Sequence, residues 1–384
     1  MIMVTHVPLG LLVLALSAAI AKAGGESDFT VFEDDESTIE LEDEGFGWAF
    51  NTRIDAEGSV LWADGIILDE YSIGTRLTSE PIDLALTITR NSYDVDYEPS
   101  IFGAPTSLAE DSWTYAFDSR VSLAKNWNLL GSASYYDGYT DYRSLWINEY
   151  YSQLFGEVPG YIEAAPKGSR FNLGVEWEYI PVVAKIRLTG VYGKDTIAPA
   201  SEFGENGLER SRPDLYTKSL QLQTENVLSQ RVIVQNTFQF TDTTNREKRW
   251  SGQTAWNIAL AEDWFLRLNA GGAIEQPNFD AYYFGGAVEY RFADDWFFRL
   301  NGRYYEDTGE IENSLGGFTS SAPSLKSVEL GAGIRWQGGH NSVNLYVGYY
   351  QTEYAPLAED NIFLENLYND RRWGLVQLTY THTF

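Results

Sequence analysis

The sequence contains no cysteine and only three histidines in 384 residues. Without cysteine there is no disulfide framework, no thiolate nucleophile and no cysteine-ligated metal. We also find no metal-ligand spacing, no glycine-rich phosphate loop and no catalytic motif. The sequence therefore predicts no metal, no cofactor and no catalytic residues.

Basic residues are scarce as well. The chain has 27 Lys and Arg against 55 Asp and Glu, which gives a formal net charge of −28. Because phosphate backbones bind to basic surfaces, this balance excludes nucleic acid as a partner. Long apolar runs are also missing. No stretch after residue 23 approaches the roughly 18 consecutive apolar residues of a transmembrane helix, so we expect none.

The first 44 residues differ from the rest of the chain. The apolar run from Leu9 to Ile20 is too short to span a bilayer, and Ala21-Lys22-Ala23 follows it like a cleavage site. We interpret residues 1–23 as a signal peptide, although the segment before the apolar run has no Lys or Arg. Residues 24–44 are rich in acids and contain no base, so we expect a disordered, solvated lead-in.

Aromatic residues are abundant, at 15% of the chain. Many stretches after residue 44 alternate apolar and polar positions, and this period of two is typical of strands with two different faces. We predict strands at 45–57, 67–79, 82–93, 112–124, 128–137, 169–180, 182–193, 215–227, 231–241, 250–260, 264–275, 281–292, 296–306, 325–337, 342–353 and 371–384. Each is long enough for a tilted strand to cross a bilayer, which takes about 9–11 residues.

The connectors between these strands alternate in length. Tight connectors such as Glu80-Pro81 and Ala293-Asp294-Asp295 follow the even-numbered strands. Most connectors after the odd-numbered strands are long: 94–111, 138–168, 194–214, 307–324 and 354–370. Transmembrane barrels have this organisation, with short periplasmic turns and long extracellular loops. In the repeated turns Ala261-Glu-Asp-Trp and Ala293-Asp-Asp-Trp, a tryptophan follows the turn, as expected at a membrane interface.

The last predicted strand, Arg371 to Phe384, places an apolar and aromatic face opposite a small and polar one. It resembles the C-terminal signature of bacterial outer-membrane β-barrels, in which alternating residues lead to a terminal Phe. The alternative is an edge strand of a soluble β-sandwich. The resemblance implies an all-β, transmembrane, antiparallel up-and-down barrel of about 16 strands over residues 45–384. It also implies a location in the bacterial outer membrane, contact with its lipid, and recognition by the barrel-assembly machinery through the strand that ends in Phe384.

The architecture is also similar to that of the general porins, whose third loop folds into the lumen. The corresponding segment here, 138–168, has the spacing of a short amphipathic helix. It lacks the family's Pro-Glu-Phe-Gly-Gly motif. The resemblance implies a homotrimer and a constriction in which loop acids face wall arginines, with these pore-lining candidates: Arg53, Arg76, Arg120, Asp141, Glu149, Glu157, Arg299 and Arg303. The alternative is an outward loop for surface contacts.

Three functions remain for such a barrel. The first is a porin-like channel for passive diffusion of small hydrophilic solutes or ions, favoured by the charged positions that alternate with the aromatic faces. The second is a structural or interaction barrel without an open pore, such as a partner sheath or a surface adhesin. The third is a hydrolase. Neither His340 nor His382 is predicted at the extracellular rim, so we expect no enzyme.

Overall fold

The structure is a computed structural model. It describes residues 51–96, 107–139, 142–155, 157–158, 166–196, 201–204, 207–210, 214–244, 247–275, 277, 279–309, 323–356 and 367–384. The predicted signal peptide, 1–23, and the predicted lead-in, 24–44, lie outside the described residues.

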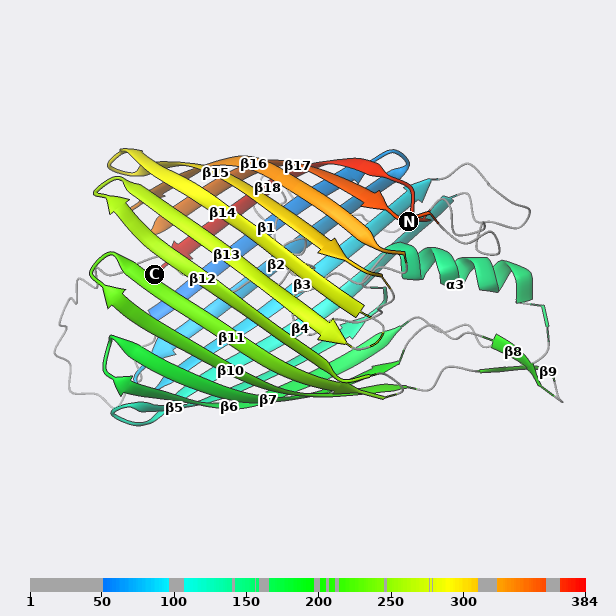
Figure 1. The fold of residues 1–384 in the computed structure, drawn as a ribbon, viewed down its shortest axis with the longest axis horizontal. Helices are drawn as coiled ribbons and strands as arrows, with labels where there is room; N and C mark the ends of the chain where they lie inside the picture. The colour runs from blue at the N-terminus through cyan, green and yellow to red at the C-terminus, as the bar shows by residue number, and fades with distance from the viewer. Residues whose placement is uncertain are drawn as a thin grey trace, which may run out of the picture.

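Sixteen antiparallel strands form a closed up-and-down barrel (Figure 1). In chain order they are β1 (Asn51–Ala63), β2 (Ile66–Ser79), β3 (Ile82–Asp96), β4 (Ser107–Ala124), β5 (Trp127–Asp137), β6 (Lys167–Ile180), β7 (Ala184–Thr196), β10 (Leu215–Ser229), β11 (Val232–Thr243), β12 (Arg249–Ala261), β13 (Trp264–Glu275), β14 (Phe279–Ala293), β15 (Trp296–Asp307), β16 (Leu325–Gly338), β17 (Asn341–Tyr354) and β18 (Arg371–Thr383). The predicted fold class and strand number are confirmed.

The barrel closes where β1 pairs with β18. The register runs from Arg53 opposite Thr383 to Trp62 opposite Gly374. This ladder satisfies the backbone groups of both terminal strands, so the sheet has no free edge. Trp62 lies against Gly374, because a Cβ at that glycine would meet the indole ring.

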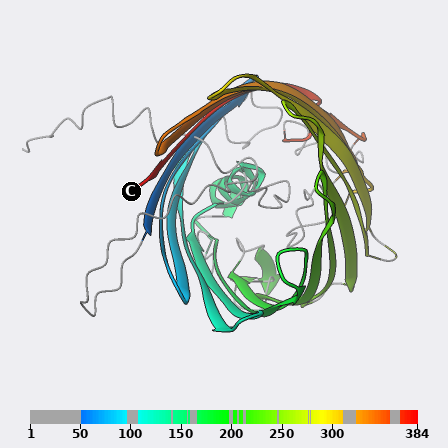
Figure 2. The ribbon, with the colours of Figure 1, turned by 90° about the vertical axis from the view of Figure 1, so that its left-hand side faces the viewer.

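The two ends of the barrel differ. One end, here called the short-turn end, carries the C-terminal residue Phe384 and the tight connectors that follow every second strand from β2 onward (Figure 1). The other, the long-loop end, carries helix α3 (Tyr142–Phe155) and a small hairpin of β8 (Ser201–Gly204) and β9 (Gly207–Arg210). Seen along the barrel from the short-turn end, α3 lies within the outline of the ring (Figure 2). The predicted segregation of connector lengths is present in the fold, while the side of a membrane that each end faces stays a prediction.

Two local predictions need correction. The first strand was predicted at 45–57, but β1 continues to Ala63, and a two-residue turn at Asp64-Gly65 leads directly into β2. Gly65 has a φ of +70°, the left-handed conformation that suits an Asp-Gly hairpin turn. The β8–β9 hairpin was not predicted, because the segment 194–214 was interpreted as a loop throughout.

The outer surface is apolar and aromatic. Trp127, Trp264 and Trp296 each begin a strand after a tight turn and are 43%, 44% and 41% exposed. Exposed apolar side chains continue along the strands between the two ends, as at Phe171, Leu173 and Val175 on β6. A soluble protein seldom exposes so much contiguous apolar area, whereas a lipid-facing wall requires it.

Candidate functional site: the charged inner wall

The inner wall of the barrel carries the polar half of each alternating strand. On β6 the exposed Phe171, Leu173 and Val175 alternate with Arg170, Asn172 and Glu176, which face the interior. The same parity places charged side chains from neighbouring strands side by side across the inner surface. This charged surface is the candidate site, because it is what a solute inside the barrel would meet.

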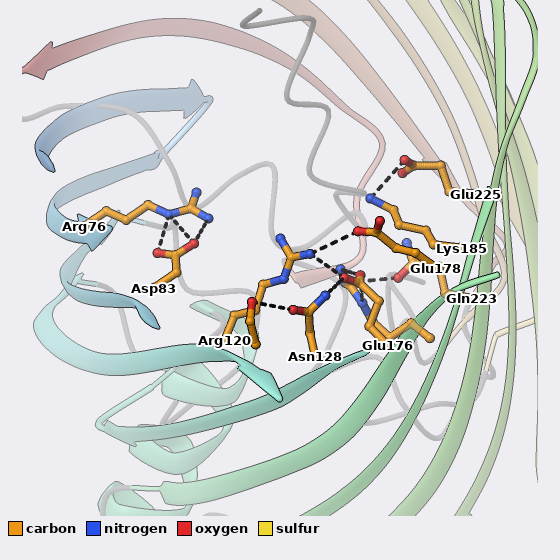
Figure 3. Close-up of polar contacts among 11 residues, drawn as sticks. Arg76, Asp83, Arg120, Asn128, Glu176, Glu178, Lys185, Gln223 and Glu225 are labelled. Carbon is orange, nitrogen blue, oxygen red and sulfur yellow. Dashed lines mark hydrogen bonds and ion pairs between the residues drawn. The ribbon is translucent and has the colours of Figure 1, made fainter. Parts of the chain in front are cut away.

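One buried carboxylate on β6 binds side chains from β4, β5 and β7. Glu176 is 1% exposed and lies between two guanidinium groups (Figure 3). Arg120 donates from Nη2 to Glu176 Oε1 at 2.7 Å, and Arg187 donates from Nη2 to Oε2 at 2.8 Å. The Asn128 amide adds a third hydrogen bond at 3.1 Å. A buried charge is stable only when it is paired and hydrogen-bonded, and Glu176 meets both conditions.

Polar contacts continue from Glu176 onto β10 and β11. Arg187 donates to Gln223 at 3.3 Å, and Lys185 pairs with Glu225 at 2.9 Å. Gln235 on β11 donates to the same Glu225 at 2.7 Å. Most charges on the wall from β4 to β11 are therefore paired, and we call it the paired wall; Arg170 on β6 is an exception, because its buried Nε has no hydrogen-bond partner among the described residues.

The strands next to the barrel closure are paired in the same way. Arg53 donates to Asp55 at 2.9 Å, and Thr381 on β18 donates to the same carboxylate at 2.7 Å. Arg76 donates from Nε to Asp83 at 2.9 Å (Figure 3). These contacts join β1 to β18 and β2 to β3 near the short-turn end.

The wall of β13 to β16 differs. Arg335 pairs with Glu289 at 2.9 Å and lies over the Phe297 ring, 4.0 Å from its centroid. Arg299 and Arg303 also face inward, and the Nε atom of each is buried without a hydrogen-bond partner within the described part of the chain. Arg120 has such an Nε too, but it pairs with Glu176 through Nη2, whereas neither β15 arginine forms an ion pair with a described acid. Because its arginines exceed its acids, we call the wall of β13 to β16 the arginine wall.

Charges on the inner wall are balanced overall but segregated. On β1 to β10 the described inward positions hold these acids: Asp55, Glu57, Glu70, Asp83, Glu110, Asp118, Glu176, Glu178, Asp195 and Glu225. Fewer bases share that side: Arg53, Arg76, Arg120, Arg170, Lys185 and Arg187. On β12 to β18 the order reverses, and Arg249, Arg267, Arg291, Arg299, Arg303, Arg335 and Arg371 outnumber Glu275, Glu289, Asp307 and Glu329. Since β15 lies across the ring from β5, the two sides face each other.

Large side chains lie flat against the arginine wall over glycines. A Cβ at Gly331 would overlap the Tyr346 ring, and a Cβ at Gly271 would meet the Tyr283 ring. The Tyr346 hydroxyl donates to Glu329 at 2.8 Å, and the Tyr283 hydroxyl donates to Gln253 at 2.9 Å. Glycine at these positions is required by the close approach of the rings, which keeps the rings along the wall rather than across the interior.

Helix α3 confirms the predicted helix within segment 138–168. Its first turn packs inside the long-loop end, where Tyr142, Leu145 and Trp146 are buried. They contact a cluster from β1, β2, β3 and β18 that includes Leu61, Ile66, Tyr93, Val95, Trp373 and Leu375. The Tyr142 and Trp373 ring centroids are 6.1 Å apart. The start of the segment is thus anchored to the inner wall.

The predicted constriction residues lie in different parts of the barrel. Arg53, Arg76 and Arg120 are near the short-turn end and pair with wall acids. Glu149 is on α3 at the long-loop end, where it accepts a hydrogen bond from Gln153 at 3.2 Å, and Glu157 is exposed just after the helix. Asp141 lies outside the described residues. The structure therefore does not bring Glu149 or Glu157 to these arginines, and the pore-lining role of all eight candidates stays a prediction.

Sequence reasoning missed some members of the inner wall. Arg249 forms a buried pair with Glu275 at 3.0 Å, and Tyr136 donates to Asp195 at 2.8 Å. Arg249 lies one residue before the predicted start of its strand, and Asp195 two residues beyond the predicted end. Extending the alternation by two residues at each end would have included both.

The described residues hold neither a helix long and apolar enough to span a membrane nor a cluster of three or more His, Asp or Glu placed to bind a metal. The first result concerns helices alone.

No protein family and no curated protein matches this sequence. Among solved structures, CdiB from Acinetobacter baumannii superposes with a TM-score of 0.51 at 12% identity, covering 87% of this chain and 60% of CdiB. The fold is that of an outer-membrane-type barrel. The chain spans only 60% of the length of CdiB.

Two further structures are similar at lower scores. A bacterial polysaccharide outer membrane secretin gives a TM-score of 0.49 at 9% identity, with 87% of this chain and 98% of that one covered. Pseudomonas aeruginosa OprD gives 0.45 at 7% identity, with 89% and 97% covered. Identities this low concern the fold alone and carry no argument about a substrate.

Proposed function

We propose that this protein is a channel in a bacterial outer membrane that lets small hydrophilic solutes or ions diffuse passively. The carrying observation is the two-faced barrel, whose outer surface is apolar and aromatic while its inner wall is charged. An outward apolar band requires lipid around it. A barrel of sixteen strands is wide enough for an aqueous interior, and charged walls favour water over a packed core.

Passive diffusion is further supported by the way the wall is built. The large inward rings Tyr283 and Tyr346 lie along the wall over glycines, which leaves the interior less obstructed. Most wall charges near the short-turn end are paired, so the wall keeps its shape without a ligand. Selectivity then follows from the radius of the lumen and from the charges that remain unpaired.

A liposome-swelling assay with the full-length protein tests the proposal. Proteoliposomes that contain the folded barrel are expected to swell in uncharged sugars, at a rate that falls as the sugar becomes larger. Heat-modifiable migration in gel electrophoresis reports that the barrel is folded. A folded barrel whose liposomes do not swell in the smallest sugar would contradict passive diffusion.

The second candidate is a structural or interaction barrel without an open pore. The observation in its favour is the anchored first turn of α3, where Trp146 is fully buried within the long-loop end. A helix held there narrows the entrance. Loss of this anchor in Trp146→Ala separates the two candidates. If the helix only narrows a working channel, wild type conducts and the variant conducts more. A wild-type barrel that is closed and opens only in the variant would favour the second candidate.

A further inference from the structure

Two arginines on β15 face the interior without a carboxylate. Arg299 and Arg303 lie on the same face of the strand, about 13 Å apart along it, since each residue advances roughly 3.3 Å. The Nε atom of each is buried and has no partner among the described residues. A buried N–H donor without an acceptor lowers the stability of the folded protein, so the presence of two such arginines needs an explanation.

The nearest acids are already engaged. The strand register places Glu289 beside Arg299 and Glu329 beside Arg303. However, Glu289 accepts from Arg335 at 2.9 Å, and Glu329 accepts from Tyr346 at 2.8 Å. No ion pair within the described residues joins either β15 arginine to these acids. The positive charge of this wall is therefore not neutralised locally, in contrast to that of Arg120 and its neighbours.

The surroundings hold these arginines without covering them. Each arginine has an acid beside it on one flank and a glycine on the other, because the register partner of Arg303 on β14 is Gly285 and that of Arg299 on β16 is Gly333. Arg303 also lies over the Tyr283 ring, 5.2 Å from its centroid. An aromatic face orients a guanidinium group while it leaves the in-plane N–H donors available.

A further cation lies nearby on β13. Arg267 is opposite Ala287, which is in turn opposite Asn301, midway between Arg299 and Arg303 on β15. Two strand spacings separate Arg267 from β15, or about 10 Å. Since arginine side chains are long, the three guanidinium groups are within reach of one multivalent anion. Guanidinium binds carboxylate and phosphate oxygens through paired N–H donors, which identifies the ligand chemistry as an oxyanion.

We propose that Arg299 and Arg303, with Arg267 beside them, form an oxyanion-binding station on the lumen wall for solutes that carry two or more carboxylate or phosphate groups. The station rests on the proposed channel function and names its solute class. It runs against the net charge of −28, which taken alone favours cations. The inner wall itself is nearly balanced and its bases gather on β12 to β18, so the charge that a solute meets beside the station differs in sign from the net charge of the chain.

Isothermal titration calorimetry of citrate into the folded, detergent-solubilised full-length protein tests the station without requiring conductance. Wild type is expected to bind citrate, and Arg299→Gln/Arg303→Gln is expected to bind at least tenfold more weakly. Binding should also weaken as salt rises, because ions screen the attraction. Inorganic phosphate and acetate serve as smaller probes, with acetate the weakest because it carries one charge.

The matched control is Arg90→Gln/Lys326→Gln. It removes the same charge from two exposed pairs, with Asp111 at 2.8 Å and Glu306 at 3.4 Å, on the outer surface near the long-loop end. Citrate binding should be unchanged in this control. Equal binding by wild type and the β15 variant, equal losses in both variants, or no citrate binding by wild type would each overturn the station. The swelling assay with uncharged sugars decides the channel function separately, because its result does not depend on an anion site.

Discussion

The paired wall and the arginine wall are built from the same residue types, arginine and glutamate, but arrange them differently. On β6, Glu176 is enclosed by Arg120 and Arg187 and takes both guanidinium groups. On β15, Arg299 and Arg303 keep donors that no acid takes. Paired charges hold neighbouring strands together and present little net field, whereas unpaired charges act on whatever enters the lumen. The comparison teaches that charge on a barrel wall indicates function only where its partners are missing.

Among the substitutions that test this difference, Glu176→Gln on the paired wall should have the largest effect on stability. The change leaves Arg120 and Arg187 close together without the carboxylate between them, so the free energy of unfolding should fall by about 3 kcal/mol. Urea unfolding in lipid vesicles, followed by tryptophan fluorescence, measures it. Glu178→Gln is the control, because Glu178 lies 3.7 Å from Arg120 and is partly exposed, and it should cost less than about 1 kcal/mol. Equal losses in the two variants would refute the central role of Glu176.

A second change concerns the flat rings of the arginine wall. Gly331→Ala forces the Tyr346 ring away from the wall and weakens its hydrogen bond to Glu329, so we expect a loss of about 1–3 kcal/mol in the free energy of unfolding. The same urea experiment applies. Gly190→Ala is the control, since a Cβ there meets only the Leu173 carbonyl oxygen at 3.9 Å. If the control lost as much, the contact with Tyr346 would not be the cause.

Arg335→Gln tests whether neighbouring arginines compensate. Glu289 would lose its 2.9 Å ion pair, but Arg299 lies beside it in the register and is available to replace Arg335. The free energy of unfolding should therefore fall by only about 1–2 kcal/mol, less than for Glu176→Gln. Adding Arg299→Gln should then cost more than either single change predicts. Strict additivity in this double-mutant cycle would argue against compensation.

The smallest effect on stability is expected for Arg299→Gln alone. No hydrogen bond to an acid is lost, so the free energy of unfolding should stay within about 0.5 kcal/mol of wild type. Urea unfolding alongside Glu176→Gln gives the comparison directly. A loss as large as that of Glu176→Gln would show that Arg299 holds the wall together.

Period-two alternation was sufficient to predict the sixteen strands and the closed barrel, because one face of each strand must be apolar to meet lipid. The end of the first strand was predicted six residues too early. Ser59, Leu61 and Trp62 continue its alternation up to the Asp64-Gly65 turn, which is itself a hairpin signal. Helix α3 was predicted from its own spacing, but its contact with Trp373 depends on barrel closure and no local pattern shows it.

The charge pairing could be predicted only in part. Alternation places Arg120, Glu176 and Arg299 on the inner face, but which charges meet depends on the register between strands. The prediction from the sequence was a balanced inner wall. The segregation of its charges was overlooked, although the inward arginines from Arg267 to Arg335 fall on consecutive strands. The expected meeting of loop acids with Arg53, Arg76 and Arg120 came from a family resemblance. Of these acids, Glu149 and Glu157 lie at the end of the barrel opposite the three arginines.

The most direct measurement is the reversal potential of single channels in a potassium chloride gradient, for wild type and for Arg299→Gln/Arg303→Gln. The account predicts discrete open channels in both proteins, with the permeability of chloride relative to potassium several-fold lower in the variant. A folded wild-type barrel that never opens, or two open proteins with the same reversal potential, would contradict it.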